Sequence, residues 1–249
     1  VAASLLAGGY SPWLAFGAAM LAGMLAGVAT GLLHTKLKIP ALLAGILTMI
    51  ALYSVNLRVM GKANLSLLRV DTVFSIMRDI GGFSNAQAVL CVGIVSSFLI
   101  GGLIYWFFGT EIGAAIRATG FNPQMIRAQG VDTNFTIILG LLISNALVAL
   151  SGALVAQNNG FADVGMGTGT IVIGLASVII GEVLFGTRSF KNCIISVVLG
   201  SIVYRLVIAA VLQMGMPPND LKLFTAILVA FALSLPLIKS KLGLRKAVK

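Results

Sequence analysis

Few residues of this chain could do acid–base, nucleophilic or metal chemistry. The 249 residues include one histidine, His34, two cysteines and seven acidic side chains. Cys91 and Cys193 lie inside separate apolar stretches, without the spacing of a disulfide framework or a metal site. A single histidine provides neither a metal ligand set nor a nucleophile–base pair. We therefore expect no catalytic residue, no bound metal and no enzymatic activity in this chain.

A glycine-rich stretch at 158–174, NNGFADVGMGTGTIVIG, invites comparison with nucleotide-binding loops. Such a loop follows a strand and continues into Lys-Ser or Lys-Thr, and this stretch does neither. We expect no nucleotide or other cofactor on this chain. The stretch predicts instead a broken or re-entrant segment before a short helix, which either lines a pathway or forms a simple outer loop.

One long polar segment, GTEIGAAIRATGFNPQMIRAQGVDTN at 109–134, interrupts the apolar sequence. Its first half predicts a short helix that Thr110 caps and Gly120 ends. Glu111 suits the positive N-terminal end of that helix, and Arg117 lies late in it, where a cation is favourable.

The second half of the segment predicts another short helix after a turn. Asn122 is placed to cap it, Pro123 takes its first position, and Gly130 follows its end. Arg127 again lies late in the helix. An ordered, exposed pair of helices predicts a docking surface for a soluble partner.

The surroundings of these residues are apolar. Hydrophobic residues make up 59% of the chain and charged residues 10%, with a mean hydropathy of +1.05. A soluble domain carries roughly 25% charged residues, so the bilayer is the expected solvent. The net charge of +10 does not predict nucleic-acid binding, because the basic residues lie mostly between apolar runs. We predict an all-α, polytopic transmembrane bundle that forms one domain over 1–249.

A spanning helix needs about 20 mainly apolar residues. The chain opens at Val1 inside an apolar run, so we expect an N-terminus cut from a longer protein, with residues 1–7 as the end of another helix. About seven spans meet the length criterion: 12–33, 41–57, 86–108, 135–157, 171–186, 192–213 and 220–238.

The loop charges predict the orientation. With the C-terminal tail in the cytoplasm, eleven of the seventeen Lys and Arg residues lie inside and five outside. The positive-inside rule favours this arrangement. The segment at 109–134 is then cytoplasmic, in a multi-pass protein with a cytoplasmic C-terminus.

Two further patterns concern packing. Ala19, Gly23, Gly27 and Gly31 recur every four residues and form a smooth stripe on the first span. Such a stripe lets helix backbones approach closely, either in a subunit contact or, as we favour, within the chain. The outer segment 58–85 is amphipathic and predicts a helix lying at the membrane interface.

The polar segment resembles the cytoplasmic coupling region of permease subunits of bacterial ABC importers, in the branch of branched-chain amino-acid, ribose and other simple-sugar permeases. HTKLKIPALLAGILTM, GFADVGMGTGTIVIGLASVIIGE and PPNDLKLFTAILV are similar to other segments of this family, in the same order. The details look closest to a subgroup linked to aromatic amino-acid binding proteins. The coupling positions that match the family pattern, or that we add to it, are Gly113, Arg117, Gly120, Asn122, Arg127, Gly130 and Val131.

The resemblance implies the partners. A second permease copy would form the pathway along the dimer axis, with cytoplasmic ATP-binding subunits below and an extracytoplasmic substrate-binding protein above. ATP and Mg²⁺ would be bound by the ATPase partner, and the lipid bilayer of a bacterial cell membrane would surround the chain. Residues 110–131 would enter a cleft of the ATPase.

Polar residues within the spans are candidates for the translocation pathway, although each could instead bond a neighbouring helix. Glu182 and Arg205 are the two charges within spans, and we predict them at different depths. The alternatives to an ABC permease for amino acids are a secondary carrier or channel, or a membrane scaffold without a pathway. The pathway candidates are Thr48, Asn56, Ser144, Asn145, Ser151, Gln157, Asn158 and Glu182.

Overall fold

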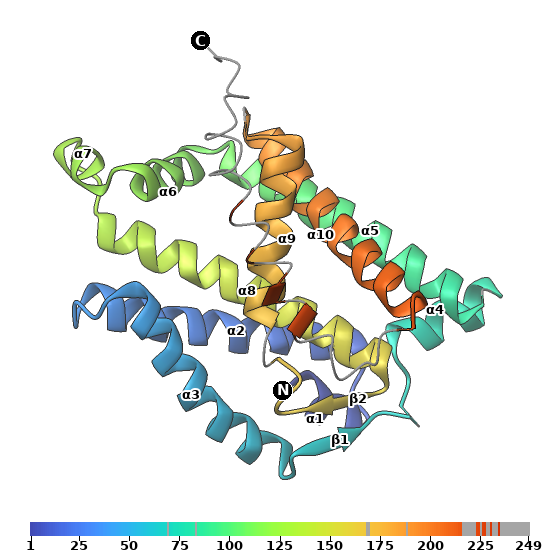
Figure 1. The fold of residues 1–249 in the computed structure, drawn as a ribbon. Coiled ribbons are helices and arrows are strands. Elements are labelled where there is room, and N and C mark those ends of the chain that lie inside the picture. Colours follow the sequence, from blue (N-terminus) through green and yellow to red (C-terminus); the bar gives the residue numbers. More distant parts are fainter. Residues whose placement is uncertain are drawn as a thin grey trace. The chain divides into compact units, whose positions relative to one another are not determined.

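The computed structural model describes residues 1–215 except 69, 83, 168, 169 and 188, together with 223, 224, 226, 227, 230 and 234. Helices dominate these residues, and two short strands form the only sheet among them (Figure 1). The elements are α1 (Ala2–Ala7), α2 (Pro12–Thr35), α3 (Ala41–Met60), β1 (Asn64–Ser66), α4 (Val73–Gly81), α5 (Asn85–Phe108), α6 (Glu111–Phe121), α7 (Pro123–Ala128), α8 (Thr133–Asn159), β2 (Phe161–Asp163), α9 (Thr170–Phe185) and α10 (Phe190–Gln213).

Five helices are long and apolar enough to cross a bilayer: α2, α3, α5, α8 and α10. They coincide with five of the predicted spans, and α9, with 16 residues, coincides with the short span predicted at 171–186. The prediction of an all-α polytopic membrane protein is confirmed. The predicted span at 220–238 and the C-terminal tail lie largely outside the described residues, so the number of spans stays a prediction.

The chain divides into two compact units, Val1–Gly167 and Thr168–Lys249. The first unit holds the elements from α1 to β2, and the second holds α9 and α10. The prediction of one transmembrane domain over the whole chain stays a prediction.

Helices α2 and α8 form the central pair of the first unit, and the small-residue stripe makes this possible. A Cβ atom added at Gly23 would lie 2.5 Å from the carbonyl oxygen of Asn145, and one at Gly27 would lie 2.5 Å from that of Leu141. Gly31 is similarly close to Ile138. The stripe therefore packs within the chain, as the favoured alternative predicts, and the two backbones touch along most of α2.

A small core closes one end of this pair. Leu6 of α1 is fully buried against α2, and Leu67 is 2% exposed beside it. Strand β1 pairs antiparallel with β2, with Leu65 opposite Ala162. The two segments predicted to lie outside the membrane, one after α3 and one after α8, thus meet in a single ribbon.

The outer segments differ in part from their sequence-based expectations. The interfacial helix predicted over 58–85 is wrong in extent: α3 continues to Met60, β1 follows, and only Val73–Gly81 is a separate helix, α4. A capping box between Thr72 and Ser75 starts α4 at this point. The glycine-rich stretch begins with strand β2 and a turn, and α9 follows at Thr170.

The second unit repeats the close-packing device on two helices. A Cβ at Gly181 of α9 would run into the carbonyl oxygen of Ser196, and one at Gly200 of α10 into that of Ser177. Ser196 is fully buried, and its hydroxyl donates to the carbonyl of Gly186 at 2.8 Å. Small residues four apart on both helices therefore bring their backbones into contact.

Candidate functional site

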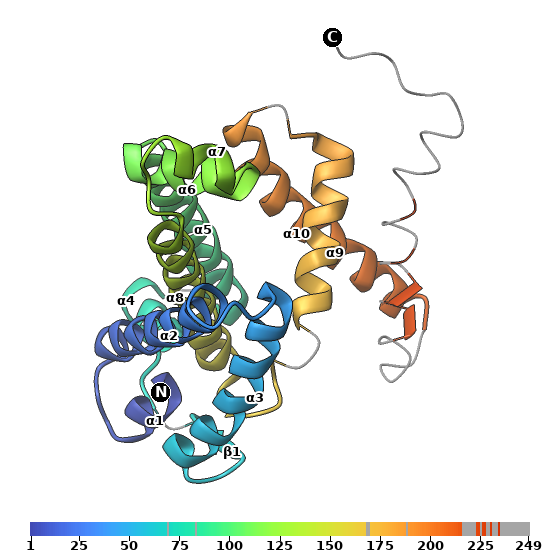
Figure 2. The same ribbon diagram turned by 90° about the vertical axis from the view of Figure 1, so that its left-hand side faces the viewer.

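The polar segment at 109–134 forms two short helices, α6 and α7, as predicted. Figures 1 and 2 show them at one end of the first unit, with α1 and β1 at the other. The hydroxyl of Thr110 accepts from the backbone N–H of Gly113 at 3.3 Å and caps α6. The side chain of Asn122 accepts from the N–H groups of Gln124 and Met125, both at 3.1 Å, and caps α7.

The predicted end of the first helix is displaced by one residue. Gly120 does not stop α6, which continues to Phe121 and ends at the extended backbone of Asn122. Asn122 precedes a proline, and this pushes its backbone away from the helical region. Gly130, with a φ of +86°, follows the last turn of α7, where a residue with a side chain would be strained.

Gly113 positions the pair against the preceding helix. A Cβ atom there would run into the carbonyl oxygen of Phe107 and lie 2.5 Å from the Cα of Phe108. The first turn of α6 therefore packs directly on the last turn of α5. Gly120, in contrast, is exposed and has no neighbour within 4 Å of an added Cβ, so packing does not require a glycine there.

Three threonines join the pair to the first turns of α8. The hydroxyl oxygens of Thr119 in α6 and Thr136 in α8 lie 3.0 Å apart, and both side chains are buried. Arg127 of α7 donates from Nη2 at 2.7 Å and from Nε at 3.2 Å to the hydroxyl of Thr133, which is 1% exposed. Side-chain hydrogen bonds therefore tie both short helices to α8, and the one between Thr119 and Thr136 is buried.

The two arginines differ in their surroundings. Arg117 is half-buried within α6, whereas Arg127 is exposed apart from its bonds to Thr133. Sequence reasoning found both arginines but missed the threonines, because isolated threonines carry no spacing signal. It also missed the apolar side chains at the elbow: Phe121 is 91% exposed and Met125 is 50% exposed.

Helix α8 presents a polar stripe on a different face from the one that contacts α2. Ser144, Ser151 and Asn158 are exposed and follow one another at seven-residue intervals, so they share one side of the helix. Val148 and Val155 lie between them and are also exposed. Of the predicted pathway residues, these three are the ones brought onto one free face.

The other predicted pathway residues of the first unit face elsewhere. Thr48 is buried and accepts from the hydroxyl of Thr30 at 2.8 Å, which joins α3 to α2. Asn145 donates to the carbonyl of Leu141 at 2.9 Å beside the glycine stripe. Gln157 is 3% exposed, and Asn56 is exposed near the end of α3.

Glu182 and Arg205, the two charges predicted within spans, do not form a pair with each other. Glu182 in α9 and Arg205 in α10 are both exposed, and no ion pair joins these two described residues.

His34 in the first unit has its Nδ1 atom 2.8 Å from the carbonyl oxygen of Ile39, which ties the end of α2 to the following loop.

Comparison with known proteins identifies the kind of subunit. Residues 1–244 match the family model described as "Branched-chain amino acid transport system / permease component". The chain is 43% identical to a tyrosine transport system permease protein of Clostridioides difficile, over 92% of this chain and 75% of the relative. It is 30% identical to the D-allose transport system permease protein of Escherichia coli, over 82% and 60% of the two chains.

A third relative is the autoinducer 2 import system permease protein of Escherichia coli, which is 29% identical over 79% of this chain and 55% of the relative. No solved structure matches the chain. The family model covers nearly all of the chain, including α6, α7 and the helices of both units. The chain therefore belongs to the branched-chain amino acid transport permease family, and as a permease component of an ABC transport system it is a transport subunit rather than an enzyme.

Proposed function

We propose that this chain is the pathway-forming subunit of an ATP-driven importer for an amino acid, and that α6 and α7 dock an ATP-binding subunit. One arrangement carries the proposal. An exposed helix pair is hydrogen-bonded to the first turns of α8, and the opposite length of α8 carries a polar stripe. The docking surface and the pathway surface are thus parts of one rigid connection.

The chemistry of this connection suggests how ATP is used. ATP and Mg²⁺ are bound by the partner, and their binding and hydrolysis move the docked helix pair. The bonds at Thr119 and Thr133 and the close contact at Gly113 pass this movement to α8 and α5. Because α8 is packed backbone to backbone on α2, the two helices move together rather than sliding past one another.

The docking surface combines charge with exposed apolar area. Phe121 projects from the elbow between the helices, and Met125 and Ile112 are exposed on the same pair. An exposed aromatic side chain of this kind is a typical anchor for a protein partner. Arg127 adds a positive charge at the end of α7, although its guanidinium is already bonded to Thr133.

The serines at 144 and 151 and Asn158 are the residues we favour as pathway lining. They offer hydroxyl and amide groups at intervals along an exposed helix face, as a hydrated path for a polar solute needs. Thr48 and Asn145 already bond within the helix bundle, so we assign them to packing. Asn56 and Glu182, on other exposed faces, and the buried Gln157 remain candidates for the pathway.

The proposed solute is an amino acid. The support is the tyrosine permease relative, whose 43% identity exceeds the 30% and 29% of the sugar and autoinducer relatives. A substrate-binding protein on the outer side and a second permease copy complete the proposed importer. The loop charges support a cell-membrane orientation with α6, α7 and the C-terminus in the cytoplasm.

The test is co-purification of an ATP-hydrolysing subunit with the full chain from membranes. The variant Phe121→Ser removes the exposed aromatic anchor from the elbow, and Tyr10→Ser removes a 56% exposed aromatic at the opposite end of the same unit. We expect the parent and Tyr10→Ser to retain the ATPase and Phe121→Ser to lose it. A parent that retains no ATPase would contradict the proposed function, and an ATPase retained by Phe121→Ser would remove α6 and α7 as its docking site.

A further inference from the structure

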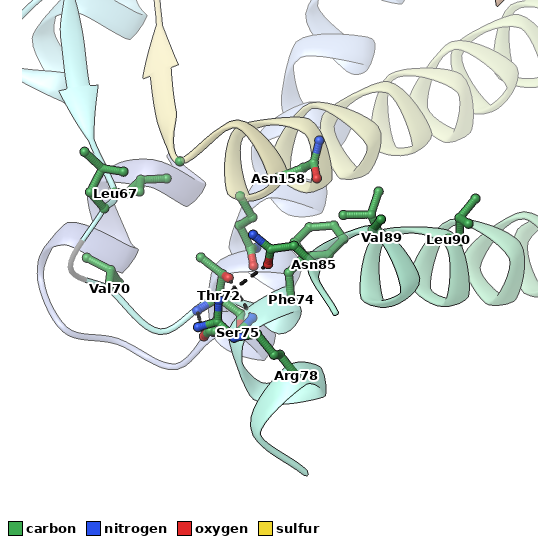
Figure 3. A pocket seen from close by; sticks show the side chains of 14 residues that line it. Leu67, Val70, Thr72, Phe74, Ser75, Arg78, Asn85, Val89, Leu90 and Asn158 are labelled. Carbon is green, nitrogen blue, oxygen red and sulfur yellow. Dashed lines mark hydrogen bonds between the residues drawn. The ribbon is translucent and has the colours of Figure 1, made fainter. Parts of the chain in front are cut away.

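A cavity of about 550 Å³ lies in the first unit, at the end opposite the coupling helices (Figure 3). The segment after β1, helix α4, the start of α5 and the end of α8 form its walls. Its size lies within the range of roughly 300–1,000 Å³ that is typical of small-molecule pockets. It lies at the outer end of α8, on the side where the proposed importer would receive its solute.

Gln157 is the residue that points to a ligand. Its side chain is 3% exposed and lines the cavity. The Oε1 atom accepts a hydrogen bond from the backbone N–H of Val73 at 2.9 Å, which fixes the orientation of the amide. The Nε2 atom is buried and has no hydrogen-bond partner among the described residues. Buried polar atoms nearly always have a partner, so this N–H group calls for an acceptor.

The lining includes one cationic side chain and two further amides. Arg78, Asn85 and Asn158 line the same cavity, and Figure 3 shows them on α4, α5 and α8. Arg78 Nη1 lies 3.5 Å from the Oδ1 atom of Asn85, which leaves the amide N–H groups of that side chain available. Asp79 lies 3.8 Å from Arg78 but is not part of the lining, and none of the described lining residues carries a carboxylate.

The remaining wall is apolar. Phe74 of α4 and Val89 and Leu90 of α5 line the cavity beside these polar groups. A ligand that fits must therefore offer hydrogen-bond acceptors and negative charge at one end and an apolar body at the other. A cationic group finds no counter-charge in the lining.

We propose that this cavity binds a carboxylate joined to an apolar group, with the carboxylate between Gln157 Nε2 and Arg78. It would form an entry subsite from which a solute reaches Asn158 and the polar stripe of α8. The proposal deepens the proposed function and rests on it. An anionic lipid headgroup shares the same chemistry, so the test separates a free carboxylate from a lipid.

The test is equilibrium binding to the full chain, with its co-purified subunits, in nanodiscs of phosphatidylcholine. Three probes share one phenyl group and differ in the charged groups that they carry. L-Phenylalanine has an ammonium and a carboxylate, 3-phenylpropanoate lacks the ammonium, and phenethylamine lacks the carboxylate. We expect the two carboxylates to bind and phenethylamine not to bind. Equal binding of all three probes would overturn the proposal.

Two variants test the residues. Arg78→Gln removes the charge from a side chain that is 49% exposed, and Gln157→Glu keeps the acceptor for Val73 but replaces the free N–H donor. We expect each to weaken carboxylate binding at least tenfold. Arg58→Gln, a loss of charge at an exposed position outside the cavity, is the matched control and should leave binding unchanged. Unchanged binding in Arg78→Gln would refute the proposed site even if Gln157→Glu failed to fold.

Further outcomes separate a lipid ligand from a free carboxylate, and failure of the proposed subsite from failure of the proposed function. If phosphatidylglycerol added to the nanodiscs displaces the carboxylates in the parent, and Arg78→Gln abolishes its retention, the site is a lipid site that excludes the proposed solute. If the parent binds no carboxylate but retains the ATPase, the subsite is wrong and the proposed function stands. Loss of the ATPase from the parent would contradict the proposed function itself.

Discussion

Gly27 in the middle of α2 provides the sharpest test of the packing between α2 and α8. An alanine Cβ at this position would lie 2.5 Å from the carbonyl oxygen of Leu141 and 2.8 Å from the Cα atom of Leu142. Both neighbours are backbone atoms of α8, so no side-chain rotation can relieve the contact. Ordinary contact begins near 3.4 Å, so α2 and α8 must separate locally by about 0.9 Å, the difference between these two distances.

The magnitude follows from two opposing effects. Inserting a methyl group into a closely packed interface costs roughly 1–3 kcal/mol, while glycine to alanine within a helix gains about 1 kcal/mol. Gly45→Ala in α3 is the matched control, because an added Cβ there meets nothing within 4 Å. We therefore expect Gly27→Ala to be less stable than Gly45→Ala by roughly 1–3 kcal/mol.

The assay is reversible unfolding of the purified protein in mixed micelles, with the midpoints of the two variants compared. Gly31→Ala should fall between them, since its nearest neighbour at 2.9 Å is the Cγ1 atom of Ile138, a side-chain atom that can move. If Gly27→Ala and Gly45→Ala unfold at the same midpoint, the close approach of α2 and α8 is not a feature of the protein. The same result would remove the argument that these helices move as one body.

Three other predictions test separate parts of the structure. Thr136→Val removes one hydroxyl of the buried Thr119–Thr136 contact at a cost of about 1 kcal/mol. We expect the ATPase subunit to stay bound to this variant. Its ATP hydrolysis, measured in proteoliposomes, should no longer depend on substrate. Gly200→Ala should destabilise the α9–α10 pair, because its Cβ would run into a backbone carbonyl of α9. An added Cβ at Gly174 in α9 meets nothing within 4 Å, so Gly174→Ala should not destabilise the pair. The measurement is the protease resistance of the two variants, and equal resistance would contradict this packing. With both native cysteines replaced by serine, Ser151→Cys should react with a hydrophilic thiol reagent. Asn145→Cys, which faces α2, should react far more slowly. The reverse order of reaction rates would contradict the proposed pathway face.

Local signals explain why much of the fold could be predicted from the sequence. Spans are visible because each needs about 20 apolar residues, a property of the segment itself. The helix pair at 111–128 is visible because Thr110 and Asn122 cap their own helices through bonds to residues two or three positions later. Neither feature depends on the rest of the molecule, so the helix pair and the spans that fall within the described residues agree with the structure to within a few residues.

The outer segments show where local signals are insufficient. The apolar positions of 58–85 allowed one long amphipathic helix, but Leu65 lies in a strand whose partner is Ala162, nearly a hundred positions later. A three-residue strand has no pattern long enough to be recognised before its partner is known. Pairing with β2 supplies the backbone hydrogen bonds that a helix would otherwise provide.

The sequence by itself determined the solvent, the spans within the described residues and the capped helices α6 and α7, because each depends on composition or on neighbours along the chain. Only the tertiary structure decided which polar residues of α8 lie against another helix and which lie on an exposed face. Helix α8 is apolar around most of its circumference, so no periodicity distinguishes Ser151 from Asn145. The approach of the glycine face of α2 buries one side of α8, and this leaves Ser144, Ser151 and Asn158 as its free polar face.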